Sequence, residues 1–248
     1  MGKLHLIGGE KGGVGKSLTA RLLGQYLIDK ELPFMGFDSD QSHGTFSRFY
    51  PEYTAAVDVS TYESLDAIID AMESNPEMNI VVDLAAQTFD RLNKWLVESD
   101  GFTLFEELGY TTYYWHVMDD GADSSYLLDQ MLDRLDTEQI QFVVVENLGR
   151  GEDFSLFEQS AVYEKARAGD ASIVQIGKLH PQLTKKIDFS NTSFWAAANN
   201  LQIMSTVERH RVRTWIKNVY EQFEPVLQQG RGANMAQPIV VVEDEFAF

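Results

Sequence analysis

The sequence predicts an α/β protein with an open, mostly parallel β-sheet that carries helices on both faces. Short apolar runs of strand length alternate with longer segments whose apolar residues recur at helical spacing. The strand-length runs are largely apolar, as in strands that are covered on both faces. A glycine-rich turn joins the first run to the first helical segment. Together these patterns indicate parallel strands that are connected by helices.

The first half of the chain is predicted to contain three strands and three helices in alternation. The first helix ends before Pro33, because proline cannot continue a helix, and the second is closed by Asn75 and Pro76. The predicted strands cover residues 4–7, 34–37 and 78–84, and the predicted helices cover 17–30, 62–74 and 89–97.

The second half continues the alternation and is expected to complete a single domain over residues 1–248. The last long helix has a buried face of five apolar residues, from Val212 to Phe223. The glycine-containing stretch 228–237 is predicted to be a flexible connection before an edge strand at 238–242 and an acidic end. The other predicted strands cover 111–118, 141–145 and 172–176, and the predicted helices cover 124–135, 155–168 and 204–223.

The composition is acidic and lacks cysteine. The 38 acidic and 20 basic residues give a formal net charge of −18, so the chain as a whole is not attracted to DNA or to anionic lipid. The absence of cysteine excludes disulfide bonds and thiolate-bound metals, iron–sulfur clusters among them. With no apolar run of membrane-spanning length and no secretory leader, the expected location is the cytoplasm, without a membrane contact.

The most informative stretch is LHLIGGEKGGVGKS, residues 4–17. Consecutive glycines let backbone N–H groups turn toward a phosphate, and the helix that follows adds the positive end of its dipole. Lys16 can then reach the β- and γ-phosphates, and the Ser17 hydroxyl can ligate Mg²⁺. A glycine-rich turn with a chance lysine is the alternative, but the strand before and the helix after the turn disfavour it. The residues expected to bind the nucleotide here are Gly12, Gly13, Val14, Gly15, Lys16, Ser17 and Leu18.

The loop departs from the common G-x-x-x-x-G-K-[ST] spacing, since position 10 is a glutamate and an additional lysine, Lys11, begins the loop. The segment KGGVGKS resembles the deviant Walker A motif of the ParA/MinD family of P-loop ATPases. The resemblance implies a P-loop NTPase fold that binds ATP or ADP with Mg²⁺. It also implies an ATP-dependent homodimer, in which Lys11 of each copy reaches the phosphates held by the other. On this resemblance the catalytic residues are Lys11, Lys16 and Asp40.

Acidic residues end two of the predicted strands. Asp83 ends an apolar strand, as in a Walker B motif, where a carboxylate holds a Mg²⁺-bound water. Asp38 and Asp40 end another strand, and they are similar to the first switch of the family. That similarity assigns Asp40 to orienting the attacking water and Asp38 to the magnesium shell, whereas two turn-forming acids are the alternative. The expected metal ligands are therefore Ser17, Asp38 and Asp83.

Both switch segments depart from the family pattern. The chain reads QSHG at 41–44, where the family often has Pro-Gln-Gly-Asn, and LAAQ at 84–87, where proline usually follows the acid. Gln87 could orient a water, as a glutamine does in some GTPases, but a structural or partner-facing role is favoured. These departures leave the hydrolysis rate open.

Asn147 follows the apolar run VVVE and matches the family's asparagine that reads the adenine edge, although buried asparagine caps are common. The segment around His180 and Pro181 is expected to line the other side of the base. The five histidines lack metal-ligand spacing. The residues expected in or near the core are His5, Tyr113, Tyr114, Trp115 and His116.

Arg209, Arg213 and Lys217 lie four residues apart and share one face of the predicted helix over 204–223. A solvated helix face is favoured. The alternative is a non-specific DNA contact, which the resemblance to some ParA proteins implies and which two copies in a dimer would strengthen. A C-terminal membrane helix of the MinD type is not expected, because the end is acidic and short.

The leading hypothesis is a slow ATPase switch whose ATP-bound homodimer engages a stimulating protein partner. By resemblance, it would control the partition, positioning or transfer of plasmid DNA or another cargo. One alternative is a metabolic ATP-dependent ligase on the same fold, for which no substrate motif is seen. Another is a nucleotide-binding scaffold with negligible turnover, which the altered switches favour.

Overall fold

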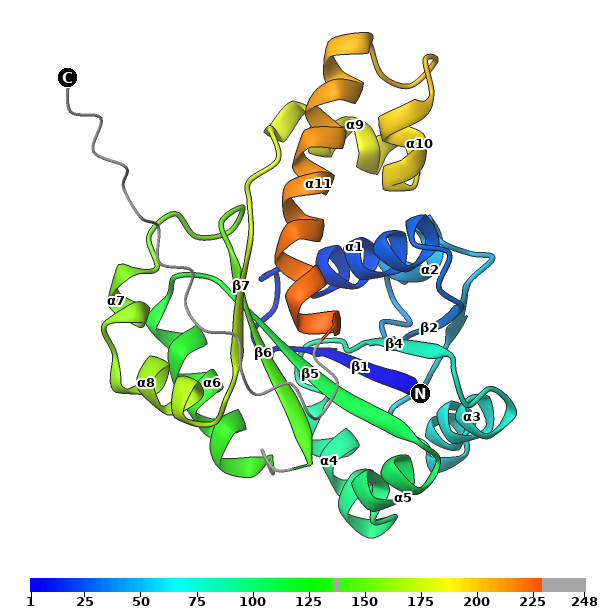
Figure 1. Ribbon diagram of the computed structural model, residues 1–248, viewed down its shortest axis with the longest axis vertical. Helices are drawn as coiled ribbons and strands as arrows, with labels where there is room; N and C mark the ends of the chain where they lie inside the picture. Colours follow the sequence, from blue (N-terminus) through cyan, green and yellow to red (C-terminus); the bar gives the residue numbers. More distant parts are fainter. Residues whose placement is uncertain (136–138, 229–248) are drawn as a thin grey trace, which may run out of the picture.

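The structure, a computed structural model, describes residues 1–135 and 139–228. They form a seven-stranded sheet in which every pairing is parallel, in the order β3-β2-β4-β1-β5-β6-β7 (Figure 1). β1 therefore lies at the centre, between β4 and β5. The strands are β1 (Gly2–Gly8), β2 (Phe34–Asp38), β3 (Thr54–Ala56), β4 (Asn79–Asp83), β5 (Tyr110–Met118), β6 (Ile140–Asn147) and β7 (Ser172–Ile176).

Helices cover both faces of this sheet, as predicted, and their buried residues fall into two core clusters. One face carries α1 (Lys16–Asp29), α2 (Thr45–Phe49), α9 (Pro181–Ser190), α10 (Phe194–Asn199) and α11 (Thr206–Gln228). The other carries α3 (Tyr62–Ser74), α4 (Phe89–Glu98), α5 (Gly101–Glu107), α6 (Ala122–Arg134), α7 (Ser155–Glu158) and α8 (Ala161–Ala168).

β5 shows how one strand supplies both clusters. Side chains alternate between the two faces of a sheet, so Tyr113 and Trp115 join the cluster under α11 while Tyr114 joins the opposite one. All three are buried, as predicted. His5 is buried beside them and accepts a hydrogen bond from Trp115 Nε1 at 3.2 Å. Burial lowers the pKa of His5 to about 3, so this core histidine is neutral.

Each predicted strand and helix within the described residues is present, with ends that differ by a few residues, apart from one helix. The prediction of a single helix over 155–168 is wrong, because the chain forms α7 and α8 instead. Ser160 interrupts the segment, and its hydroxyl accepts a hydrogen bond from Tyr163 N at 3.3 Å. A serine in this N-cap position starts a new helix.

Five further elements were not predicted from the sequence: α2, β3, α5, α9 and α10. These elements are short, so no extended apolar period marks them. α9 and α10 matter most, because they help to enclose the candidate site. The connection and edge strand predicted at 228–242 lie outside the described residues, except for Gln228, which ends α11.

α11 is held against the sheet at several points along its length. Trp215 Nε1 donates a hydrogen bond to the Gly177 carbonyl at 2.6 Å. Farther along, the buried Phe223 ring lies 5.2 Å from the Trp115 ring and 6.5 Å from Tyr26, with edge-to-face geometry. Lys3 Nζ donates to the Leu227 carbonyl near the end of the helix.

Replacing Phe223 by alanine should leave a cavity between α11, β5 and α1. We expect the free energy of unfolding to fall by about 3–5 kcal/mol, measured by urea denaturation. Phe189→Ala is the matched control: its side chain is 88% exposed, so the expected change is below about 0.5 kcal/mol. Equal effects of the two substitutions would contradict the packing of α11 on the sheet.

Candidate functional site

Polar groups from five segments meet at the carboxyl ends of the strands. The glycine-rich loop follows β1, while Asp38 and Asp83 end β2 and β4 as register partners on neighbouring strands. Asp119 follows β5, and Asn147 ends β6. Open parallel sheets bind ligands at this end of their strands.

The glycine-rich loop is fastened to β6 by Asn147. Asn147 Nδ2 donates a hydrogen bond to the Val14 carbonyl at 2.6 Å, and its Oδ1 accepts one from Gly149 N at 3.0 Å. Gly15 has φ 111°, and a Cβ at that position would lie 2.2 Å from Asn147 Nδ2. Both the left-handed backbone and this close approach require glycine.

Lys16 is buried inside the curve of the loop. Its Nζ donates a hydrogen bond to the Lys11 carbonyl at 3.0 Å. Burial lowers the pKa of Lys16, and the carboxylates of Asp83, Glu10 and Asp40 oppose that effect. The ammonium group is thus positioned within the loop, where a phosphate would replace the carbonyl as its partner.

Asp83 is 2% exposed, and neither of its carboxylate oxygens has a hydrogen-bond partner. Burial raises its pKa to about 7, while the nearby Ser17 hydroxyl opposes the rise and Asp38 adds to it. A buried carboxylate without partners is the group that a cation stabilises most. Ser17 and Asp83 therefore fit a magnesium ion.

A magnesium ion here would also need ligands from water and a nucleotide. Among residues 1–135 and 139–228, no three acidic or histidine side chains lie close enough to hold a metal by themselves. Mg²⁺ commonly binds one or two protein oxygens and completes its octahedron with waters and substrate phosphates.

Asp38 and Asp40 form the turn after β2. Asp38 accepts backbone hydrogen bonds from Asp40 at 3.0 Å and from Ser47 at 2.9 Å, which ties α2 to the sheet. Asp40 Oδ1 accepts hydrogen bonds from the backbone N–H groups of Ser42 and His43, at 3.0 and 3.1 Å. The Asp40 side chain remains 37% exposed at the rim of the site. The turn geometry accounts for both acids and still leaves Asp40 accessible.

Lys11 forms an ion pair within its own chain. Its Nζ lies 2.8 and 3.0 Å from the two carboxylate oxygens of Asp119. Burial alone would raise the pKa of Asp119, but hydrogen bonds from Lys11, the Ser124 hydroxyl and Gly121 N lower it below its usual range. Asp119 was not among the site residues predicted from the sequence. Its position after β5, the strand beside β1, was the available signal.

A cavity of about 270 Å³ lies beside the loop, between α1 and α9, and is called here the α1–α9 cavity. It is lined by Leu18, Asn147 and Pro181, all three expected near the nucleotide, whereas His180 lines a neighbouring cleft. Its only acid among the described residues is Asp188, although acids outnumber bases about two to one in the whole chain. The basic lining residues are Arg21, Arg150, Lys178 and Lys185. This excess of positive charge favours an anionic ligand.

Arg21, on α1, contributes to the wall of the α1–α9 cavity. Its side chain is 6% exposed, and the guanidinium lies 3.5 Å from the Phe49 ring centroid and 4.7 Å from that of Phe194. It also lies 3.4 Å from an Asp188 carboxylate oxygen. Arg21 thereby joins α1 to α9 and α10. Its place in the apolar stripe of the first helix gave no signal of this role.

The predicted basic face of α11 is partly engaged in packing. Arg213 Nε donates a hydrogen bond to the Ala198 carbonyl at 2.9 Å, and Arg209 donates one to the Asn199 carbonyl at 3.4 Å. Both carbonyls lie at the C-terminal end of α10, where cations are favourable. Lys217 is exposed and lies 3.6 Å from Glu221. These contacts support a structural and solvated role for the face.

Comparison with known proteins gives relatives over most of the chain. No protein-family model matches it. It is 25% identical over 246 residues to a Protein TraL of Escherichia coli, covering 90% of this chain and 98% of that protein. It is 24% identical over 220 residues to Protein MobD of Acidithiobacillus ferrooxidans, covering 88% and 96%. The MinC:MinD cell division protein complex of Aquifex aeolicus matches with a TM-score of 0.50 and 12% identity, over 88% of this chain and 96% of that chain.

The chain thus has the fold of the ParA/MinD class of P-loop ATPases, as the loop sequence predicted. Its sequence is similar to those of TraL and MobD over most of its length. No helix in the described part of the chain is long and apolar enough to cross a membrane.

The pKa of Asp83 predicts a pH-dependent stability in the absence of metal. Between about pH 4 and 7 the folded protein binds more protons at Asp83 than the unfolded chain does. This stabilising contribution, at most about 4 kcal/mol, is present at the acid end and is lost as the pH rises to 7. Asp83→Asn should abolish it, so the variant should gain stability relative to the wild type as the pH rises, measured by urea unfolding in EDTA.

Glu77→Gln is the control for that experiment, because it removes an exposed carboxylate and should give no such gain. A stability difference between Asp83→Asn and the wild type that is the same at about pH 5 and about pH 7.5 would contradict the raised pKa.

Proposed function

We propose that this protein is a switch ATPase that binds ATP with Mg²⁺, dimerises when ATP is bound and hydrolyses the nucleotide slowly. The observation that carries the proposal is the buried, unpaired carboxylate of Asp83 beside Ser17, at the glycine-rich loop. A magnesium nucleotide would bring Asp83 a positive charge in addition to that of Lys16, together with the phosphates that the loop can bind.

The roles of the residues follow from their positions. Ser17 and Asp83 would hold the ion, and Asp38 would act in its outer shell, since both Asp38 oxygens already accept backbone hydrogen bonds. The backbone N–H groups of residues 12–18 and the Lys16 ammonium would bind the phosphates. A bound Mg²⁺ would neutralise the charge that develops on the transferred phosphoryl group. Asp40, held at the exposed rim, would orient the attacking water.

The α1–α9 cavity is proposed as the site of the nucleoside. Leu18 and Pro181 offer apolar contacts to a base, and the remaining N–H of Asn147 is available to its edge. Adenine is the base that the family resemblance implies. The surrounding basic side chains complement a nucleotide even though the whole chain is acidic.

Lys11 would act across a dimer interface. In the single chain its ammonium group is paired with Asp119, so it must exchange that partner for the phosphates bound by the other copy. Hydrolysis would release the γ-phosphate and leave ADP, and Lys11 could then return to Asp119. The ion pair would therefore favour the separated chains.

The similarity to TraL and MobD and the MinD fold support a cytoplasmic switch that controls partition, positioning or transfer of plasmid DNA or another cargo. A protein partner would stimulate hydrolysis. A DNA contact through Arg209, Arg213 and Lys217 has less support than these roles, because two of the three side chains already bind α10.

The dimer can be tested with the Asp40→Ala variant, which should retain ATP because hydrolysis is slowed. With ATP and Mg²⁺, light scattering should show the mass rising from the 28.1 kDa of one chain to twice that value, and with ADP it should not. Adding Lys11→Ala should abolish the rise while nucleotide binding persists. If the mass of the Asp40→Ala variant is the same with ATP as with ADP, the dimerising switch is rejected. The ligase and the nucleotide-binding scaffold would then remain as alternatives.

Asp119→Asn should release Lys11 while keeping a hydrogen-bond acceptor for Ser124 and Gly121. A partly exposed ion pair is worth about 1 kcal/mol. The association constant of the ATP-bound dimer should therefore rise about fivefold for each chain in which the ion pair is removed, measured by light scattering across a dilution series. Asp123→Asn, an exposed acid on the same segment, is the control and should change nothing. Weaker dimerisation of Asp119→Asn would show that Asp119 supports the interface instead.

A further inference from the structure

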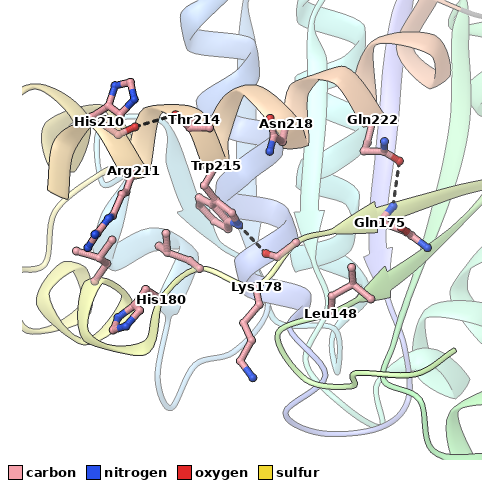
Figure 2. A pocket seen from close by; sticks show the side chains of 13 residues that line it. Leu148, Gln175, Lys178, His180, His210, Arg211, Thr214, Trp215, Asn218 and Gln222 are labelled. Carbon is pink, nitrogen blue, oxygen red and sulfur yellow. Dashed lines mark hydrogen bonds between the residues drawn. The ribbon is translucent and has the colours of Figure 1, made fainter. Parts of the chain in front are cut away.

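A second hollow, outside the proposed nucleotide site, lies between α11 and the segment 177–183 that follows β7. It is called here the α11 cleft, and its volume is about 540 Å³, within the range of ligand-binding clefts of about 300–1,000 Å³. Figure 2 shows that side chains of α11 form one wall and that β7 and the following segment form the other. The cleft adjoins the α1–α9 cavity, because Lys178 and Trp215 line both.

The two ends of the α11 cleft differ in chemistry. One end is basic and is lined by Arg211, His210 and His180 (Figure 2). The other end is lined by the amides of Gln175 and Gln222, and Lys178 lies between the two ends. Asn218 lies on α11 between these two groups. No aspartate or glutamate in the described part of the chain lines the cleft. The whole chain has 38 acidic and 20 basic residues, so a cleft that is lined by bases and no acid differs from the average composition of the protein.

Several lining groups are available to a ligand. The side chains of Arg211 and Asn218 make no hydrogen bond or ion pair with residues 1–135 or 139–228, and both residues are exposed. Gln222 uses its carbonyl oxygen to accept a hydrogen bond from Gln175 N at 3.3 Å, which leaves its amide N–H groups as donors. A cation and neutral amides therefore face the same space.

The backbone edge of β7 in this cleft is already occupied. Gln222 accepts the N–H of Gln175, and Trp215 donates to the carbonyl of Gly177 at 2.6 Å. A ligand could not add a strand at these two positions. It would instead meet side-chain amides, which both donate to and accept from a peptide backbone, and cations, which bind carboxylates.

We propose that the α11 cleft binds an extended segment of a partner protein that carries two or more carboxylates. The carboxylates would lie at the Arg211 end, and the peptide backbone would run past Asn218 and Gln222. A nucleic acid fits less well, because cations would be needed along the whole groove and, among the described residues, its only phenylalanine, tyrosine or tryptophan ring is that of the 8%-exposed Trp215. The proposal does not depend on nucleotide hydrolysis.

The test is selection of a random dodecapeptide display library on the full-length protein, followed by fluorescence polarisation with the selected peptide. We expect a consensus with acidic residues at fixed positions and at least tenfold weaker binding to Arg211→Glu. Lys217→Glu introduces the same charge change on an exposed position of the same helix and should leave binding unchanged. Asn218→Ala should weaken binding without a change in charge.

Absence of an acidic consensus, or equal losses in Arg211→Glu and Lys217→Glu, would overturn the proposal. So would competition by a single-stranded dT12 oligonucleotide that binds more tightly than the peptide, because the cleft would then serve nucleic acid. A chain that ends at Gln228 is selected in parallel. A consensus found only on that shorter chain would assign the cleft to the protein's own acidic residues at 243–245, and would also overturn the proposal.

Discussion

The site depends on one hydrogen bond that spans the end of β5, from Asn147 on β6 to the carbonyl of Val14 in the loop after β1. The loop lacks a helix or strand of its own, so its shape needs support from neighbouring strands. Asn147 provides it, and the close contact explains why position 15 must be glycine. With the loop held there, Lys16 is buried within its curve and Ser17 lies beside Asp83. A loop held in this way would lose less conformational entropy on binding an anion than a loop that must first become ordered.

Electrostatic strain and electrostatic complementarity are concentrated in the same region. Asp83 is buried without a hydrogen-bond partner, and its burial outweighs the attraction of the Lys16 ammonium, so its pKa is raised. The walls of the adjoining cavity carry an excess of basic side chains in an otherwise acidic protein. The magnesium ion of a bound nucleotide would stabilise the Asp83 carboxylate, and the phosphates would complement the basic side chains of the cavity. Ligand binding and stability are therefore expected to be coupled, since a ligand that binds only the folded state stabilises it.

Lys11 shows how a single residue can belong to two arrangements. Its ion pair with Asp119 satisfies the lysine within one chain, so any partner in another chain must compete with an existing contact. Such competition would produce a switch if the two arrangements had similar free energy, because a ligand that favours one of them could then interconvert them. The α11 cleft adjoins the α1–α9 cavity, because Lys178 and Trp215 line both, so a peptide in the cleft would lie next to a nucleotide in the cavity.

The sequence by itself determined the class of fold, most of its strands and helices, and the glycine-rich loop that follows β1. These features follow from local patterns: apolar runs, helical spacing and a glycine–lysine–serine sequence. It also identified the acids that end β2 and β4, because strand ends of a parallel sheet converge. Tertiary structure alone decided the pairing of Lys11 with Asp119, the burial of Arg21 between two rings, and the basic lining of the cavity and cleft. The residues in these features lie far apart in the chain and come from segments with no shared period. The pairing of β1 with β5 brings Lys11 and Asp119 together, whereas the packing of α9, α10 and α11 against the sheet forms the surroundings of Arg21, the cavity and the cleft.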